Sequence, residues 1–389
     1  MNTGKTLGLY LHIPFCRQKC VYCDFYSLAG NESRMDEYTD ALCTHLELWS
    51  PRAAEYSVDT VYFGGGTPSY LGADRLRRIL DTLLRLYSVS KTAEITLEAN
   101  PDSAGDPAVL KQLRDAGFNR ISLGMQSACA EELAEIGRIH TPEQVRSAVT
   151  AARIAGFDNL SLDLIYGLPH QTMERWAENL SAAAALEPEH LSCYGLKVEP
   201  GTPLFARRET AGLPDDEAQA DMYLYTVEFL RNAGYVQYEI SNFSKSDRES
   251  RHNLKYWTLG EYLGFGPGAH SDFGGERFAC GRDLSAYLQG IRAQTPILSE
   301  REELTFADRA SEWLMLGLRT VRGLDPAAFE ADFHQPFSMF VPFLNQCRKA
   351  GYAALEDGRW HLTPRGFLLS NQIIGELLDL LPAADTCLL

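Results

Sequence analysis

The chain has 389 residues, of which 45% are hydrophobic and 23% are charged, and this balance excludes a disordered chain and a short peptide scaffold. Its length exceeds the roughly 250 to 300 residues at which a single core stops growing, so we expect one large domain and a smaller one. The 36 basic and 52 acidic side chains give a net charge of −16, which disfavours a nucleic-acid partner.

The ends of the chain carry no targeting pattern. Met1 to Leu7 include one Lys and no apolar run, which argues against a secretory signal. Cys387 is third from the end, whereas a prenylated cysteine is fourth. We therefore expect a cytoplasmic protein, with peripheral contact at the inner membrane as a further expectation. Nine cysteines, an odd count in a reducing compartment, favour metal ligands and core thiols over disulfides.

In the first half of the chain, short runs in which apolar and polar residues alternate are separated by segments with helical spacing. The runs predict six strands, over 7–13, 59–63, 94–98, 120–124, 159–165 and 190–194. The segments between them predict helices over 33–49, 74–87, 106–116, 142–155 and 173–185. Strands joined by crossover helices run parallel, so the pattern predicts an α/β sheet or barrel.

The unusual residues fall where the predicted strands end. In strand order they are Cys16, Cys20 and Cys23, then Gly64 to Gly66, Asn100 and Pro101, Gln126 and Ser127, and Gly167 to Pro169. In βα barrels the loops at this end converge on the active site. We therefore expect these five segments to surround one cavity.

A different pattern begins after about residue 300. It consists of a helical segment over 306–320, a hairpin with Asp357 and Gly358 at its turn, and a helix from about Pro364. This predicts a small winged-helix-like module, but its 8 basic against 12 acidic side chains disfavour DNA, so a lid or docking role is expected. The predicted divisions are a core over 1–240, a connecting segment over 241–300 and a C-terminal domain over 301–389.

Three cysteines, Cys16, Cys20 and Cys23, lie within eight residues of one another. A structural zinc site needs four closed ligands, usually from two separated pairs, and the sequence shows no second pair. Three thiolates suit a [4Fe-4S] cluster whose fourth iron stays open to a small chelating molecule. The cluster is the favoured hypothesis and zinc is the alternative.

The cysteine spacing, together with Gly64-Gly-Gly-Thr-Pro68 after the second strand, resembles the radical S-adenosylmethionine (SAM) superfamily. The resemblance implies a partial (β/α)6 TIM-like barrel. It also implies that SAM chelates the fourth iron and that an electron from the cluster cleaves it to a 5′-deoxyadenosyl radical. No catalytic side chain is assigned.

The same resemblance implies which residues hold SAM. Gly64, Gly65, Gly66 and Thr67 would let bare backbone approach the methionine amino group, and a Cβ there would obstruct it. An acid and a polar amide would bind the ribose, an arginine the carboxylate, and a tyrosine would complete the site: the candidates are Tyr10, Glu98, Gln126, Arg138 and Asp163. The alternative is that these residues cap helices or pair at the barrel rim. Gly264 to Gly268 is expected to be a tight loop near the cavity.

Five segments resemble the oxygen-independent coproporphyrinogen III oxidase group more specifically: 10–16, 64–68, 123–127, 163–169 and 238–243. That group has an oxidase branch and a haem-chaperone branch. The oxidase branch carries a further cysteine where this chain has Phe25, and a longer N-terminal extension. The chaperone branch has the motif that stands here as His252-Asn-Leu-Lys-Tyr-Trp257. The resemblance therefore implies a haem chaperone.

The motif at residues 252–257 has a physical rationale for haem. A neutral imidazole such as that of His252 is a good axial ligand for haem iron, and Tyr256 and Trp257 offer flat surfaces for a porphyrin. The alternative is that His252 and Trp257 are structural. The other functions left open are a coproporphyrinogen III oxidase and a tRNA-modifying enzyme. Expected partners are haem, a haem-acceptor protein such as a respiratory one, an electron donor such as flavodoxin or ferredoxin, and a second copy of the chain.

Overall fold

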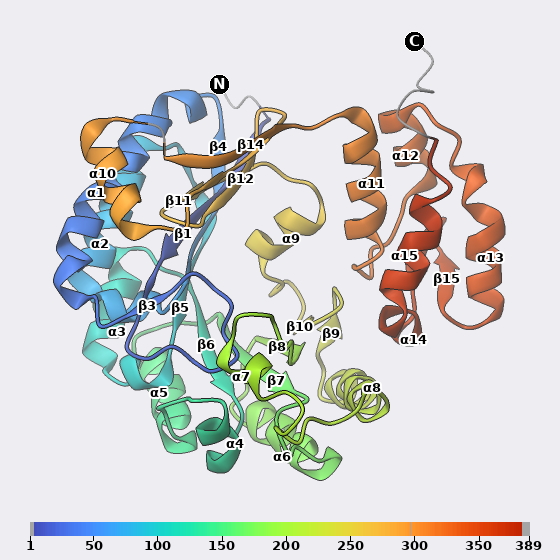
Figure 1. Cartoon of the computed structure of the whole chain (residues 1–389), viewed down its shortest axis with the longest axis horizontal. Coiled ribbons are helices and arrows are strands. Elements are labelled where there is room, and N and C mark those ends of the chain that lie inside the picture. Colours follow the sequence, from blue (N-terminus) through green and yellow to red (C-terminus); the bar gives the residue numbers. More distant parts are fainter. Residues whose placement is uncertain (1–3, 296, 383–389) are drawn as a thin grey trace.

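A computed structural model describes residues 4–295 and 297–382 (Figure 1). Its main sheet has twelve strands in the order β14-β13-β12-β11-β1-β4-β5-β6-β7-β8-β10-β9. Six neighbouring strands are parallel: β1 (Thr6–Ile13), β4 (Ser57–Gly65), β5 (Val89–Ala99), β6 (Arg120–Gln126), β7 (Leu160–Tyr166) and β8 (His190–Gly195). The six predicted strands and the parallel α/β fold are confirmed.

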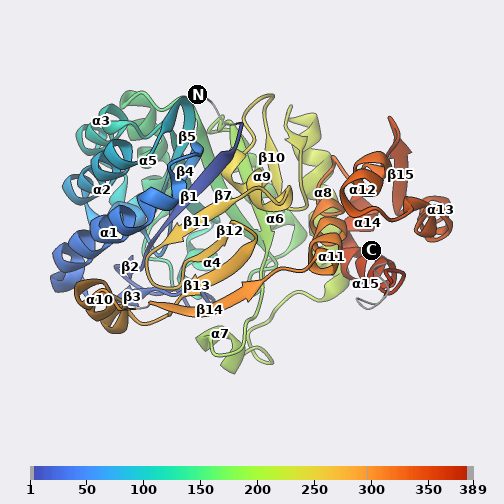
Figure 2. The ribbon, with the colours of Figure 1, turned by 90° about the horizontal axis from the view of Figure 1, so that it is seen from above.

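Helices on one side of the sheet connect these parallel strands (Figure 2). They are α1 (Met35–Trp49), α2 (Ala73–Leu86), α3 (Pro107–Ala116), α4 (Ala130–Glu135), α5 (Pro142–Ile154) and α6 (Met173–Ala184). The predicted helices agree with α1, α2, α3, α5 and α6 to within two residues at each end. Caps explain their starts, since Thr141 forms a capping box with Gln144 at α5 and the Thr172 side chain accepts from Arg175 N–H at α6.

The alternation along the parallel strands separates two environments. Leucines at alternate positions, such as Leu7, Leu9 and Leu11, are fully buried in the large core cluster together with apolar residues of the helices. Polar residues occupy the other positions and face the inside of the curved sheet, among them His12, Thr60, Thr96, Arg120, Ser122, Ser161, Asp163 and Ser192. The hydrophobic core therefore lies between strands and helices, and the inner face is polar.

The segment predicted to be a connection adds strands to both edges of the sheet. Beyond β8 lie β10 (Asn242–Ser244) and β9 (Val236–Gln237), and β11 (Tyr262–Phe265) pairs parallel to β1. Beyond β11 the sheet continues antiparallel through β12 (His270–Phe273), β13 (Glu276–Cys280) and β14 (Leu298–Glu303). These strands have two to six residues, too short for periodicity to reveal. The predicted domain divisions stay a prediction.

Helix α9 (Arg251–Trp257) lies between the sheet and the C-terminal helices (Figure 1). Both carboxylate oxygens of Glu94 in β5 accept from its first backbone N–H groups, those of Arg251 at 3.2 Å and His252 at 3.1 Å. Lys255 Nζ lies 2.9 Å from a carboxylate oxygen of Asp59 in β4. These contacts fix α9 against the inner side of the barrel strands.

The C-terminal domain has its own core, formed by residues such as Leu314, Phe329, Phe340 and Trp360. Its elements are α11 (Phe306–Gly317), α12 (Pro326–Phe333), α13 (Val341–Lys349), the hairpin β15 (Ala353–Glu356) and β16 (Arg359–Leu362), α14 (Pro364–Leu368) and α15 (Ser370–Leu378). The predicted hairpin is confirmed, and Asp357 and Gly358 at its turn both have positive φ.

Three further helices complete the described chain: α7 (Pro203–Ala206), α8 (Asp216–Asn232) and α10 (Leu284–Ala293). Tyr223 of α8 belongs to the core of the C-terminal domain, while Met222 belongs to that of the barrel, so α8 packs against both. No helix within the described ranges is long and apolar enough to cross a membrane.

Candidate cluster and cofactor site

A cavity of about 510 Å³ opens where the parallel strands end. Its wall includes all three cysteines of the predicted cluster motif and the ends of the neighbouring strands, represented by Gly66 after β4, Asn100 after β5 and Gln126 at the end of β6. The expectation that segments far apart in sequence surround one cavity is confirmed for the first four strand ends. From the fifth segment, Gly167 to Pro169, no residue is among those that line the described cavity.

Backbone contacts hold the cysteine loop in place. Cys16 ends the two-residue strand β2 (Phe15–Cys16), which pairs with β3 (Leu28–Ala29). Between Cys20 and Cys23, the backbone of Val21 donates to Ile136 O at 3.2 Å and accepts from Leu204 N at 2.9 Å. The loop is therefore tied to the segments after β6 and β8.

A chain of hydrogen bonds runs from one cysteine through the strand ends and back to the loop. Thr67 Oγ1 donates to Cys16 Sγ at 3.4 Å, and Asn100 Nδ2 donates to Thr67 Oγ1 at 3.1 Å. Arg138 then donates to Asn100 Oδ1 at 2.8 Å and to the hydroxyl of Tyr22 at 3.2 Å. Because Tyr22 lies between two of the cysteines, this chain fixes the loop relative to β4 and β5.

The three cysteine thiols are suited to bind an iron–sulfur cluster as thiolates. Burial raises the pKa of Cys16, and hydrogen bonds from Thr67 and Ser27 and the charge of Arg138 oppose that effect. Burial likewise raises the pKa of Cys23. No three His, Cys, Asp or Glu side chains among the described residues are placed to hold one metal ion. Three thiols spread over the wall of one cavity are donors suited to a cluster.

The glycines at the end of β4 allow a close approach of backbone and side chains. A Cβ on Gly65, which has φ +110°, would lie 2.7 Å from the His12 ring, and one on Gly66 would lie 2.8 Å from Phe15 O. Gly66 N also donates to Ile13 O at 2.8 Å, and Gly65 N donates to Glu98 at 3.2 Å. These two glycines let β4 pack against the start of the cysteine loop. Their contact with SAM stays a prediction.

Two partly buried acids lie on the inner wall. Glu98 accepts from the Tyr62 hydroxyl at 2.8 Å, and burial, helped by the nearby Asp163, raises the pKa of Glu98 to about 7. Asp163 accepts from Ser122 at 3.1 Å, and burial raises its pKa as well. Burial therefore disfavours the charged form of both carboxyls, and Glu98 is partly protonated near neutral pH.

Most of the predicted SAM residues are brought together. Gly65, Gly66, Thr67, Glu98, Gln126, Arg138 and Asp163 line the described cavity. Gln126 adopts φ 62°, a conformation that is costly for a non-glycine residue. Tyr10 and Gly64 are not among the lining residues, and Tyr10 instead packs against Tyr62 and His252 at ring distances of 6.3 and 6.4 Å.

The predicted haem residues occupy a different place. His252 is 1% exposed, and its Nδ1 and Nε2 lie 2.9 and 2.8 Å from the hydroxyls of Thr60 and Tyr256. Burial lowers its pKa to about 3, so the ring is neutral. Trp257 is half-buried. Haem ligation by His252 would require its hydrogen bonds to break, and it stays a prediction; Asn253 is the motif residue that lines the cavity.

Sequence reasoning missed several residues of the cavity wall. They are Tyr22, Tyr62, Arg120, Ser122, Ser192, Tyr194 and Asn253. Side chains at every second position of a strand point to the same face. Counting in steps of two from Glu98 or Asp163 would therefore have identified Thr96, Ser161 and Ile165 as inward-facing positions. Applied to the fourth strand, the same count would have found Arg120 and Ser122.

Comparison with known families agrees with this geometry. Residues 10–183 match the Radical SAM superfamily, and residues 304–369 match the HemN C-terminal domain. The solved structure of coproporphyrinogen III oxidase (HemN) from Escherichia coli, described as a radical SAM enzyme, superposes with a TM-score of 0.83 at 28% identity, covering 95% of this chain and 89% of that one. The fold is that of a radical SAM protein.

Curated relatives narrow the assignment. "Heme chaperone HemW" of Bacillus subtilis is 34% identical over 373 residues, covering 95% of this chain and 98% of the relative. "Heme chaperone HemW" of Escherichia coli is 36% identical over 373 residues, covering 95% and 97%. The chain belongs to the HemW family.

Proposed function

We propose that this protein binds haem and delivers it to an acceptor protein, using a [4Fe-4S] cluster held by Cys16, Cys20 and Cys23 and SAM at the open iron. The observation that carries this proposal is the cavity itself, where three thiols of one loop face the buried polar ends of neighbouring strands. When bound, the cluster supplies a one-electron donor and an iron that chelates SAM. Membership of a family whose relatives are named haem chaperones supports haem as the cargo.

The residues around the thiols suit SAM. The carboxyls of Glu98 and Asp163, with raised pKa values, are suited to hold hydroxyl groups such as those of a ribose. The Gln126 side chain at the strand end offers an amide to the same ligand.

Phe25 stands where the resembling oxidases have a further cysteine, and its side chain is 69% exposed at the cavity wall. An exposed aromatic ring beside the cysteine loop offers a flat apolar surface to a ligand. A porphyrin face is such a ligand. This placement supports cargo binding over oxidase chemistry.

The test uses protein reconstituted with iron and sulfide without oxygen. Haem is titrated into the parent and followed by a saturable shift of the Soret band, and iron is counted in Cys16→Ala, Cys20→Ala and Cys23→Ala. We expect saturable haem binding by the parent and loss of cluster iron from each variant, with Cys129→Ala as the control that keeps it. Absence of a saturable shift would reject the haem proposal, and full iron in the variants would reject the ligands.

The second candidate is a coproporphyrinogen III oxidase, and the superposition on the Escherichia coli oxidase at a TM-score of 0.83 favours it. Coproporphyrinogen III, SAM and a reductant are incubated with the reconstituted protein and the tetrapyrroles are separated by chromatography. Formation of protoporphyrinogen would replace the chaperone proposal. Recovery of unchanged substrate would retain it.

Three finer expectations belong to the same proposal. The electron donor is a small redox protein such as flavodoxin or ferredoxin, and the haem acceptor is a respiratory or other haem-requiring protein. The protein works in the cytoplasm, with peripheral contact at the inner membrane during delivery, and it forms a homodimer. Cross-linking in cells followed by mass spectrometry, with sedimentation of the purified protein, tests each of these.

A further inference from the structure

Arg120 is the first residue of β6, and its side chain points into the inside of the curved sheet. The residue is 2% exposed, yet it lines the cavity that holds the cysteines. Its register partner in β5 is Thr96, which is paired in turn with Tyr62 of β4. Arg120 therefore lies deeper in the barrel than Gly66, Asn100 and Gln126, which mark the strand ends.

The guanidinium group of Arg120 has no partner among the residues that the structure describes. Among the described residues it forms no hydrogen bond and no ion pair within 4.0 Å, and its Nε is buried without an acceptor. Arg138, which lines the same cavity, instead donates to Asn100 and Tyr22. A guanidinium carries five N–H donors, and leaving such a group buried and unpaired is costly. The cost is removed when an acceptor occupies the cavity.

The acids near Arg120 are engaged with other donors. Glu94 accepts from the backbone of α9, Glu98 from Tyr62 and Gly65, and Asp163 from Ser122. These acids act on Arg120 only at longer range. Burial lowers the pKa of Arg120, but the charge of Glu94 and of other groups nearby outweighs that effect, so the pKa is raised. Arg120 is therefore a cation whose donors are free to meet a ligand.

We propose that Arg120 is a carboxylate-binding residue at the inner end of the cavity. A planar guanidinium matches the two oxygens of a carboxylate with two parallel hydrogen bonds, a geometry that lysine lacks. This inference rests on the proposed function for its two candidate ligands, haem and SAM, which both carry carboxylates. The carboxylate is either a haem propionate or the methionine carboxylate of SAM.

The test compares acid and carboxylate-free forms of each ligand on the reconstituted full-length protein. Haem and iron protoporphyrin IX dimethyl ester are titrated by absorbance, and SAM and decarboxylated SAM by calorimetry. The proteins are the parent, Arg120→Ala, Arg120→Lys and Arg146→Ala, whose arginine is an exposed partner of Glu143 on α5. We expect Arg120→Ala to bind one of the two acids at least tenfold more weakly, Arg120→Lys to fall between, and Arg146→Ala to match the parent.

The pattern across the ligands decides the outcome. A loss confined to haem identifies a propionate, and a loss confined to SAM identifies the methionine carboxylate. Equal affinities in parent and Arg120→Ala for both acids, or equal losses for the acid and its carboxylate-free form, overturn the proposal. If the parent does not bind haem, the proposed function fails while the SAM titration still decides the role of Arg120. Should Arg120→Ala fail to fold, Arg120→Lys and Arg120→Gln carry the same comparison.

Discussion

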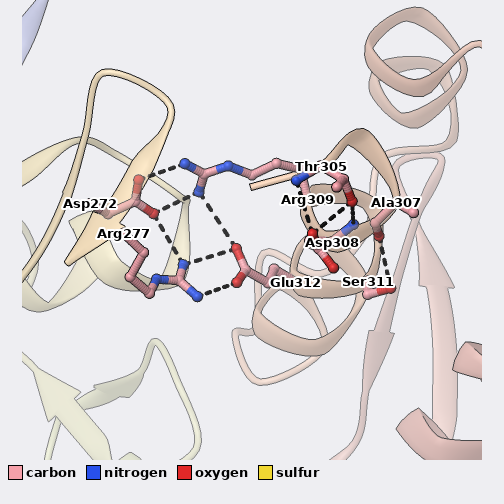
Figure 3. A network of polar contacts seen from close by, with 8 residues as sticks. All are labelled: Asp272, Arg277, Thr305, Ala307, Asp308, Arg309, Ser311 and Glu312. Carbon is pink, nitrogen blue, oxygen red and sulfur yellow. Dashed lines mark hydrogen bonds and ion pairs between the residues drawn. The ribbon is translucent and has the colours of Figure 1, made fainter. Parts of the chain in front are cut away.

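Arg309 of α11 donates to both carboxylate oxygens of Asp272 in β12, from Nη1 to Oδ2 at 2.6 Å and from Nη2 to Oδ1 at 2.5 Å (Figure 3). Arg277 of β13 donates to the same carboxylate at 3.1 Å and also pairs with Glu312 of α11. The Asp272 side chain is 5% exposed. Two arginines and two acids thus join the edge of the sheet to the first helix of the C-terminal domain.

This four-residue network predicts how firmly the domains adhere. In Asp272→Asn, two arginines lose a charged acceptor in a largely buried place, so we expect the free energy of unfolding to fall by about 2 kcal/mol. Arg309→Lys should lose less, because it keeps the charge but not the paired hydrogen bonds. Urea unfolding measures the free energy of unfolding of both variants. Glu143→Gln, at an exposed ion pair on α5, should keep the unfolding midpoint of the parent, because solvent screens the pair. An unchanged midpoint for Asp272→Asn would contradict this account.

Gly66→Ala should disturb the cysteine loop. The added Cβ would lie 2.8 Å from Phe15 O and 2.9 Å from Ile13 O, and both are backbone atoms that cannot rotate away. We expect a loss of about 2 kcal/mol in the free energy of unfolding and a lower iron content after reconstitution. Gly375→Ala in α15, where the new Cβ meets nothing within 4 Å, is the matched control and should keep the iron. Parent-like stability and iron in Gly66→Ala would refute the packing role.

Glu98 makes stability depend on pH in a defined direction. Its pKa rises from 4.5 to about 7 on folding, so between these values the folded carboxyl keeps a proton that the unfolded chain has lost. Stability therefore declines as the pH rises through this interval, by roughly 3 kcal/mol in full above pH 7.

Glu98→Gln removes this dependence. Relative to the parent, the variant should gain about 3 kcal/mol in the free energy of unfolding between pH 4.5 and pH 8, measured by urea unfolding at several pH values. Glu178→Gln, on the exposed face of α6, should show the same pH dependence of the free energy of unfolding as the parent over this range. If Glu98→Gln also showed the pH dependence of the parent, the Glu98 carboxyl would be ionised in the folded protein and this account would be wrong.

His252→Ala tests the structural role of this histidine apart from haem. The change removes two hydrogen bonds and the packing against Tyr62, at a ring distance of 5.2 Å. We expect the haem-free protein to lose about 3 kcal/mol of unfolding free energy, whereas His270→Ala at an exposed position should lose little. Haem affinity is then compared at a temperature where both variants are folded. A weaker affinity in His252→Ala alone would support ligation, and stability equal to the parent would contradict the packing role.

The strands and the cavity could be predicted because their physical signals are local. Alternation in 7–13 or 120–124 follows from one apolar and one polar face, and the three cysteines lie within a single loop. The short strands β11 to β14 lack such a signal, since their place is decided by pairing with β1 and with one another. The same limit applies to α9, whose position depends on Glu94 more than a hundred residues earlier.

The sequence indicated candidate residues for the site but not their electrostatics. Residue type and spacing indicated Cys16, Cys20 and Cys23, and the resemblance to the radical SAM superfamily indicated the acids Glu98 and Asp163. The unpaired state of Arg120 arises from where its neighbours direct their own hydrogen bonds, which a linear pattern does not contain. The burial of His252 between tyrosines is likewise a property of packing between two strands, β1 and β4, and helix α9.

In the parallel strands β1 and β4 to β8, most apolar residues face outward to the helices, and most polar residues face inward. Folding free energy is thus gained mainly on the convex side of the sheet, while chemistry is determined on the concave side. Substituting inward residues such as Ser122 or Ser192 should therefore change which ligand the protein binds without unfolding the barrel. An architecture divided in this way lets related proteins diverge in cargo and reaction while keeping the same framework.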